Sequence, residues 1–199
     1  MPQQPILMVY AGPNGSGKSS ITQAFPSVGY YVNADEIQKQ LNCSALEAAQ
    51  IATKTREKLL QMNVTFSFET VLSTDRNLKL MQTALANGYR VICIYVLTRH
   101  PSINVKRVDH RVHAGGHSVD SAKIVQRYHR AMKLIPELCK ACSRLLIFDN
   151  SLDNTDFDPS LIAEISSCEI TTYPSSLWPY ADIIQLLSGQ YNPDESERL

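Results

Sequence analysis

An apolar run that leads directly into a glycine-rich loop is the feature that most restricts how this sequence can fold. Residues Ile6–Ala11 form the run, and the next eight residues, Gly12-Pro-Asn-Gly-Ser-Gly-Lys-Ser19, match the pattern GxxxxGK[ST] without a mismatch. A short unbroken apolar run is typical of a strand buried on both faces of a parallel sheet. The pattern requires a strand before it and a helix after it, and a helix is predicted from about Gly17 to Phe25. We therefore expect an α/β fold with a mainly parallel sheet.

The same loop, a Walker A motif, predicts a binding site for phosphate groups. Its glycines allow successive backbone N–H groups to point at phosphate oxygens, and the following helix adds the positive end of its dipole. Lys18 is expected to reach the β- and γ-phosphates of ATP or GTP, and the Ser19 hydroxyl to take one coordination position of Mg²⁺. The residues expected to bind the nucleotide are Gly12, Pro13, Asn14, Gly15, Ser16, Gly17, Lys18, Ser19 and Ser20. The alternative is a glycine-rich turn that binds nothing.

The rest of the chain alternates between strand and helix patterns. Further strands are predicted at 28–32, 65–69, 90–97, 145–148 and, as an edge strand, 168–173. Further helices are predicted at 36–41, 45–62, 74–86, from 101, from about 119 and at 180–187. This alternation indicates a three-layer α/β/α fold of the P-loop NTPase type, doubly wound and nucleoside-kinase-like, with a helical lid. The 199 residues suit a single domain, 1–199, in which the polar end, 190–199, is predicted to be flexible.

Charge is distributed unevenly, although 19 basic side chains balance 19 acidic ones. Residues 1–98 carry a net charge of +2, residues 99–144 of +7 and residues 145–199 of −9. Because only 19% of the residues are charged, a generally basic nucleic-acid binder and a disordered acidic protein are disfavoured. Five cysteines, an odd number, and a beginning without a leader or membrane-spanning pattern predict a cytoplasmic protein with reduced thiols. Cys139 and Cys142 are interpreted as packed thiols of a helix.

Signatures of several other P-loop classes are missing from the sequence. It lacks the Asn-Lys-x-Asp motif that reads guanine, is too short for an ABC-type ATPase, and its strand at 91–96 does not end in the usual aspartate. These absences favour a small-molecule kinase whose acidic groups come from other strand ends.

Two carboxylates follow predicted strands, where ligands of open α/β sheets bind. Asp35 is expected either to accept a proton from an attacking hydroxyl or to cap a helix that begins at Glu36. Glu69 is expected either to contact the substrate or to be an exposed charge at a strand end.

The basic middle block predicts two arginine-bearing helices joined by a glycine pair, Gly115 and Gly116. Arginines that close over the β- and γ-phosphates stabilise phosphoryl transfer, so residues of about 100–135 are interpreted as a lid, with a solvated helical face as the alternative. The basic lid residues are Arg107 and Arg111 on the first helix and Lys123, Arg127 and Arg130 on the second, where Val125, Tyr128, Met132 and Ile135 are predicted to be buried. Zinc binding by His110, His113 and His117 is not favoured, because the glycines interrupt the helical spacing. Nucleic-acid binding is also not favoured, because Tyr128 alone could stack on bases.

In their order along residues 5–151, these motifs resemble the zeta-toxin family of P-loop kinases, and more closely its short stand-alone members, often labelled predicted ABC-type ATPases. The segments that carry the resemblance are Gly12–Ser19, Asn33–Glu36, Phe66–Thr70, Arg107–His117, Gln126–Tyr128 and Phe148–Ser151. The resemblance implies ATP- or GTP-dependent phosphorylation of a hydroxyl on a small metabolite, with the 3′-hydroxyl of the sugar in UDP-N-acetylglucosamine as the best-known case. It also implies a small antitoxin protein as a partner.

The resemblance further implies a role for each matching residue. Lys18 and Ser19 would bind phosphate and Mg²⁺, Asp35 would be the catalytic base, and Glu69 with Thr70 would touch the substrate. The first lid position would be filled by Arg107 or Arg111, and the second by His117 or Arg127. Two hypotheses of other kinds are a non-catalytic ATP-binding regulator and a kinase that acts on nucleotides or polynucleotide ends.

Overall fold

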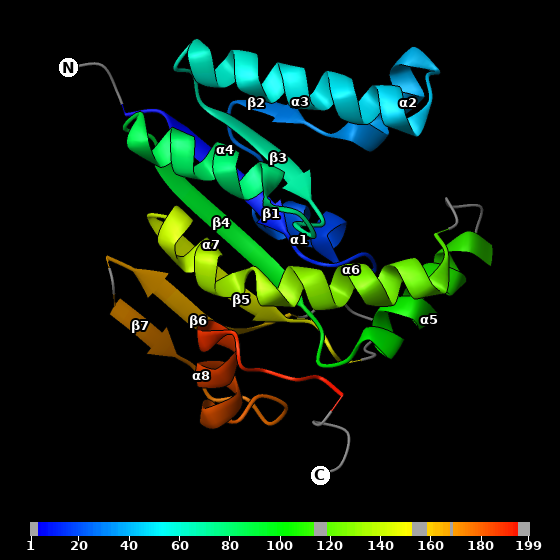
Figure 1. Ribbon diagram of the computed structural model, residues 1–199, viewed down its shortest axis with the longest axis vertical. Coiled ribbons are helices and arrows are strands. Elements are labelled where there is room, and N and C mark those ends of the chain that lie inside the picture. The colour runs from blue at the N-terminus through cyan, green and yellow to red at the C-terminus, as the bar shows by residue number, and fades with distance from the viewer. Residues whose placement is uncertain (1–3, 114–118, 153–158, 168, 195–199) are drawn as a thin grey trace.

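The computed structural model describes residues 4–113, 119–152, 159–167 and 169–194 (Figure 1). Its strands are β1 Ile6–Ala11, β2 Tyr30–Val32, β3 Phe66–Thr70, β4 Arg90–Leu97, β5 Arg144–Asp149, β6 Ser160–Ser166 and β7 Glu169–Thr172. Its helices are α1 Lys18–Ala24, α2 Ala34–Leu41, α3 Ala45–Gln61, α4 Asp75–Ala86, α5 Pro101–His113, α6 Ser121–Lys133, α7 Ile135–Ala141 and α8 Tyr180–Ser188.

These strands form one sheet in the order β2-β3-β1-β4-β5-β6-β7. The first five strands in this order are parallel, and at the end of β1 Ala11 lies opposite Thr70 on β3 and Tyr95 on β4. The chain continues from β1 to β2 and β3, which lie toward one edge of the sheet. It then continues to β4 and β5, which lie on the other side of β1. The carboxyl ends of β1 and β4 therefore flank the point at which ligands of open α/β sheets bind.

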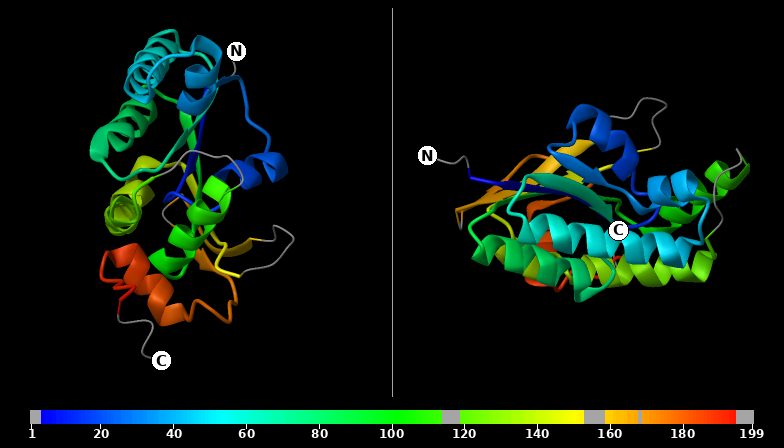
Figure 2. Two further views of the ribbon diagram at one scale, coloured as in Figure 1. Left: turned by 90° about the vertical axis from the view of Figure 1, so that its right-hand side faces the viewer. Right: turned by 90° about the horizontal axis from the view of Figure 1, so that it is seen from above.

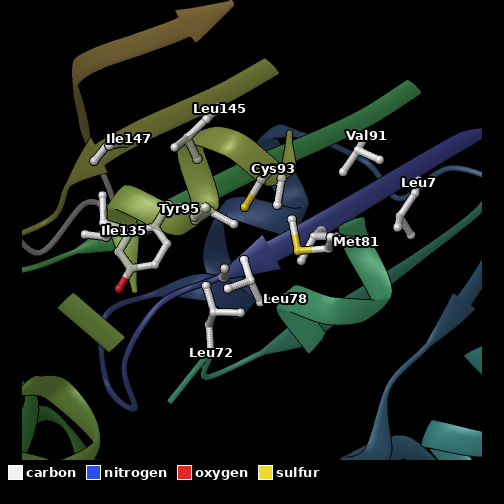
Figure 3. Close-up of a cluster of buried hydrophobic side chains, with 14 of the residues drawn as sticks. Leu7, Leu72, Leu78, Met81, Val91, Cys93, Tyr95, Ile135, Leu145 and Ile147 are labelled. Carbon is white, nitrogen blue, oxygen red and sulfur yellow. The ribbon is translucent and has the colours of Figure 1, made fainter. Parts of the chain in front are cut away.

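Helices cover both faces of the sheet, but unequally. α3, α4, α7 and α8 lie on one face and α1 lies on the other (Figure 2). In the larger core, Leu7, Cys93 and Leu145 of three neighbouring strands pack with Met81 of α4 and Ile135 of α7, all fully buried (Figure 3). A smaller core lies on the α1 face; its buried members are Tyr10, Ile21, Ile94, Val96, Leu146 and Phe148. The expected three-layer, mainly parallel architecture is confirmed.

The helix predicted from Val119 differs from the structure in its extent and in its buried face. It ends at Lys133, and α7 begins after Leu134 with Pro136 in its first turn, where the missing proline N–H costs no helical hydrogen bond. Val125 is only half-buried, whereas its neighbour Ile124 is fully buried beside Tyr128.

Strand β6, which begins the antiparallel edge of the sheet, is absent from the sequence prediction. β6 pairs with β5, and its apolar pattern is interrupted by Glu164, which hides the strand from a search for apolar runs. The Arg144 guanidinium on β5 donates from Nε to Glu164 Oε1 over 2.8 Å, so a cross-strand ion pair compensates this carboxylate. The predicted edge strand at 168–173 corresponds to β7, with Cys168 outside the described residues.

Cys139 of α7 and Cys142 at its C-cap are free, half-buried thiols packed against the larger core, as predicted. In the described part of the chain, no helix is both long and apolar enough to cross a membrane.

Candidate functional site

The phosphate-binding loop, residues 12–17, joins the end of β1 to the start of α1, as its pattern requires. Two of its glycines have backbone angles that favour glycine, with φ of 143° at Gly12 and 77° at Gly15. A Cβ atom at Gly12 would lie 2.0 Å from the Val96 carbonyl oxygen, and one at Gly15 would lie 2.6 Å from the Asn104 carbonyl oxygen. Both glycines are therefore required by the close approach of β4 and α5 to the loop.

Side chains from elements distant in the sequence donate hydrogen bonds to carbonyl oxygens of the loop. Asn104 of α5 donates from Nδ2 to the Asn14 carbonyl oxygen over 2.7 Å, and Asn150 after β5 donates to the Ser16 carbonyl oxygen over 2.8 Å. Asn104 is fully buried, and its Oδ1 accepts a hydrogen bond from the Thr98 hydroxyl. The sequence predicts no role at the loop for either asparagine, although Asn150 lies in the segment Phe148–Ser151 that carries the family resemblance. Nothing in their local pattern shows that they reach a loop about 90 and 134 residues away.

Lys18, the first residue of α1, lies at the centre of the site. Its Nζ donates to the carbonyl oxygens of Gly12 and Pro13 over 2.7 and 2.8 Å. Burial lowers the pKa of Lys18 to about 8; the nearby Glu69 and Asp35 carboxylates oppose this shift, and Arg111 adds to it. The ammonium group is thus within electrostatic range of two predicted substrate-side carboxylates and one predicted lid arginine.

The other loop residues fit a triphosphate and its metal ion. Gly17 has φ of 102° at the N-cap of α1, and no side chain in the described part of the chain caps that helix end. Ser19 is exposed in the first turn of α1, the position at which this loop pattern places a hydroxyl ligand of Mg²⁺. Ser16 is fully buried, and its Oγ has no hydrogen-bond partner among the described residues. A phosphate oxygen bound at this loop would give the buried hydroxyl the hydrogen-bond acceptor that it lacks among the described residues.

Asp35 does not cap its helix, so that alternative is wrong. α2 begins two residues earlier than predicted, and its N-cap is Asn33, whose Oδ1 accepts from the Asp35 N–H over 2.9 Å. Asn and Asp are both favoured at N-caps, so residue type alone does not distinguish Asn33 from Asp35. The Asp35 carboxylate is exposed in the first turn of α2. α2 follows the carboxyl end of β2, and Lys18 follows the carboxyl end of the parallel strand β1.

Glu69 is not an exposed strand-end charge. It is half-buried, and its Oε1 accepts from the Tyr31 hydroxyl over 2.7 Å, while Asn33 Nδ2 donates to that hydroxyl over 3.1 Å. Burial together with this bond to the carboxylate raises the pKa of Tyr31. The next residue, Thr70, contacts the start of the phosphate-binding loop, because its carbonyl oxygen accepts from the Gly12 N–H over 3.2 Å.

The predicted lid residues fall into two groups. Arg127 of α6 donates to Asn14 Oδ1 over 3.3 Å, and Arg111 of α5 lies near enough to Lys18 to affect its pKa. Arg107 instead donates from Nη1 and Nη2 to the carbonyl oxygens of Asn150 and Leu152, over 2.7 and 2.9 Å. Arg107 therefore fastens α5 to the segment after β5. His117 and the glycine pair lie outside the described residues.

A carboxylate that is missing from the end of β4 is present at the end of the neighbouring strand, β5. Asp149 is 5% exposed and accepts a hydrogen bond from Ser151, whose Oγ also accepts from the Arg99 N–H over 2.7 Å. Burial raises the pKa of Asp149, although the Ser151 hydrogen bond opposes this shift. The carboxylate thus shapes the turn that presents Asn150 to the loop.

The fold and the loop together define a P-loop α/β protein. No protein-family model matches the chain. An uncharacterised protein of Haemophilus influenzae is 29% identical over 126 residues, which cover 60% of this chain and 89% of that protein.

Several solved structures share this fold, one of them from a toxin-antitoxin system. A structure of the PezAT chromosomal toxin-antitoxin system of Streptococcus pneumoniae matches with a TM-score of 0.56 and 19% identity, covering 99% of this chain and 89% of the other. The AvrRxo1-ORF1:AvrRxo1-ORF2 complex with sulphate ions matches with a TM-score of 0.66 and 14% identity, covering 96% of this chain and 66% of the other. A structure of that complex with ATP matches with a TM-score of 0.62 and 14% identity, covering 99% of this chain and 75% of the other. The resemblance to zeta-toxin-like P-loop kinases is confirmed at the level of the fold.

Proposed function

We propose that this chain is an ATP-dependent phosphotransferase that phosphorylates a hydroxyl of a small metabolite, UDP-N-acetylglucosamine or another nucleotide sugar. The observation that carries the proposal is the electrostatic setting of Lys18, which lies on the phosphate-binding loop within range of Asp35, Glu69 and Arg111. A phosphate-binding cation and an exposed carboxylate at one sheet edge are the groups that transfer of a phosphoryl group to a hydroxyl needs. The fold shared with the AvrRxo1-ORF1:-ORF2 structure that contains ATP supports ATP as the donor.

In the proposed reaction, Asp35 accepts the proton of the acceptor hydroxyl as the oxygen bonds to the γ-phosphorus. The bond from that phosphorus to the bridging oxygen breaks, and ADP leaves. Lys18 exchanges its two carbonyl partners for phosphate oxygens, with Arg111 and Arg127 adding positive charge above them. Mg²⁺ bound through Ser19 would supply further charge neutralisation. Glu69, held by Tyr31, would orient the acceptor.

The test is transfer of label from γ-labelled ATP to purified UDP-N-acetylglucosamine and to a metabolite extract. Asp35→Asn keeps the size of the side chain but removes the base, and we expect at least a hundredfold lower rate, about the contribution of general-base catalysis. Glu36→Gln is the matched control, because Glu36 is an exposed carboxylate in the same helical turn. Unchanged transfer by the Asp35 variant would remove Asp35 as the base. ATP binding without transfer to any acceptor would favour a nucleotide-binding regulator, and labelling of oligonucleotide ends would favour a polynucleotide kinase.

We further propose that the chain is a cytoplasmic toxin restrained by a small antitoxin protein. The support is its fold, shared with a chain of the PezAT toxin-antitoxin system. Induced expression should arrest bacterial growth with the wild-type chain and not with Lys18→Ala. Equal growth of the two strains at equal protein levels would contradict the toxin role.

A further inference from the structure

Three polar side chains connect the interior of α3 with the carboxyl end of β3. Arg56 is 8% exposed, donates from Nε to the Ala52 carbonyl oxygen over 3.0 Å, and lies with its guanidinium carbon 4.7 Å from the centre of the Phe68 ring. Its Nη1 donates to Asn77 Oδ1 of α4 over 3.2 Å. Asn77 Nδ2 in turn donates to Thr70 Oγ1 over 2.8 Å.

The direction of these hydrogen bonds follows from what each group can do. A guanidinium only donates, so the atom of Asn77 that faces Arg56 must be the carbonyl oxygen, and the amide nitrogen must face Thr70. Thr70 Oγ1 also accepts from the Leu72 N–H over 3.0 Å. Both lone pairs of the Thr70 hydroxyl are therefore occupied, and its hydrogen is the only hydrogen-bonding capacity left. Among the described residues, no group accepts that hydrogen.

Thr70 is placed where this hydrogen can reach a ligand. It lies opposite Ala11 at the carboxyl end of β3, it is half-buried, and its backbone contacts Gly12 of the phosphate-binding loop. Glu69, the proposed acceptor contact, precedes it. A hydroxyl that can only donate requires an acceptor in the ligand, and a phosphate or amide carbonyl oxygen, which has no hydrogen of its own, is a strong acceptor.

We propose that Arg56 and Asn77 are positioning residues that fix Thr70 as a hydrogen-bond donor to a phosphate or carbonyl oxygen of the acceptor molecule. The inference rests on the proposed function and specifies how its acceptor is recognised. In this arrangement, the acceptor hydroxyl that is phosphorylated gives up its proton to Asp35, and Thr70 binds a different oxygen of the acceptor.

The substitution Asn77→Asp tests this directly, because it preserves the shape of the side chain and reverses one hydrogen bond. A carboxylate accepts from both Arg56 and Thr70, so the Thr70 hydrogen must turn inward and is lost to the ligand. The ion pair with Arg56 should keep the urea midpoint of unfolding at or above that of the wild type. We expect the KM for UDP-N-acetylglucosamine to rise about tenfold, the effect of one hydrogen bond to a charged group, while kcat changes less than KM.

Two further variants separate this effect from a charge effect. Thr70→Val removes the hydroxyl and should raise the KM by a similar factor, and the double variant should show no further rise. Asn87→Asp adds the same charge at the exposed C-cap of the same helix and should leave the KM unchanged. A KM of Asn77→Asp equal to that of the wild type would overturn the inference. A KM that is higher in the double variant than in Thr70→Val alone would also overturn it, because the new carboxylate would then repel the acceptor directly.

Calorimetric binding of UDP-N-acetylglucosamine without ATP provides the same comparison without turnover. A binding defect in Asn77→Asp and Thr70→Val, combined with no label transfer by the wild type, would overturn the proposed function and keep the inference. No binding to the wild type would overturn both for this acceptor.

Discussion

The support that Asn104 gives to the phosphate-binding loop leads to a quantitative prediction. The substitution Asn104→Leu fills the same fully buried space but leaves the Asn14 carbonyl oxygen without its 2.7 Å donor. The Thr98 hydroxyl also loses its Asn104 acceptor and keeps only a 3.4 Å contact with the His100 carbonyl oxygen. An unsatisfied buried polar group costs about 1–3 kcal/mol, so we expect the free energy of unfolding to fall by about 3 kcal/mol.

The same change should weaken ATP binding, because the loop is no longer held in the conformation that presents its N–H groups. If about 1.4 kcal/mol of the free energy lost in the loop is lost from ATP binding, the Kd for ATP rises about tenfold. Asn104→Asp refines the assignment, since a carboxylate still accepts from Thr98 but cannot donate to Asn14. We therefore expect Asn104→Asp to weaken ATP binding at least as much as Asn104→Leu.

Urea unfolding and calorimetric titration with ATP measure the two effects. Lys106→Gln is the control, because Lys106 is exposed on the same helix. The reasoning would be refuted by a loss of stability below about 1 kcal/mol in Asn104→Leu, or by wild-type ATP affinity in both Asn104 variants.

Two further predictions concern Lys18 and Arg99. The folded state lowers the pKa of Lys18 from 10.5 to about 8, so between these pH values the unfolded chain binds more protons than the folded protein. The free energy of unfolding of the wild type should therefore increase with pH relative to that of Lys18→Met. The affinity of the wild type for ATP should fall over the same range, because the Lys18 ammonium group loses its charge. The free energy of unfolding of each protein is measured with urea from about pH 8 to 10. An equal dependence on pH in the two proteins would contradict the pKa shift. Arg99→Lys keeps the charge beside Asp182 but loses stacking over the Trp178 and Tyr191 rings, whose centres lie 4.8 and 5.5 Å from the guanidinium carbon. We expect a loss of about 1–2 kcal/mol in thermal unfolding, with exposed Arg90→Lys as the control, and an equal melting temperature would exclude the stacking role.

The acidic end of the chain gains a partial explanation from the structure. Asp182 pairs with Arg99, and Glu164 pairs with Arg144, so carboxylates of the −9 segment neutralise arginines of the +7 segment. Tyr191, inside the segment predicted as a flexible tail, packs on Trp178 with ring centres 4.9 Å apart and donates to the Arg99 carbonyl oxygen. The C-terminal elements thus bind the turn after β4 that leads into α5.

Local signals were sufficient for much of the fold. The boundaries of β4 agree with the prediction, because Arg90 is followed by the unbroken apolar run Val91–Leu97, most of which is β-branched or aromatic. β6 was missed because Glu164 interrupts its pattern, and only the pairing with Arg144 makes that carboxylate acceptable within the sheet. Helical spacing and the family resemblance both left Arg107 and Arg111 as candidates for one lid position, because they give the face of a side chain but not its partner; in the structure Arg107 bonds to the Asn150 carbonyl oxygen.

By itself, the sequence determined the phosphate-binding loop and its place between a buried strand and a helix, since both depend on residues that are adjacent in the chain. It also predicted Lys18 as a site residue from the loop pattern, Asp35 and Glu69 from their positions after strands, and Thr70 from the family resemblance. Tertiary structure alone decided how those residues are held. Asn104 and Asn150 reach the loop, and Arg56 reaches Thr70 through Asn77, only because parallel strands bring distant segments to the same edge of the sheet. Hydrogen bonds of this kind depend on distance in space, which no local pattern of residues records.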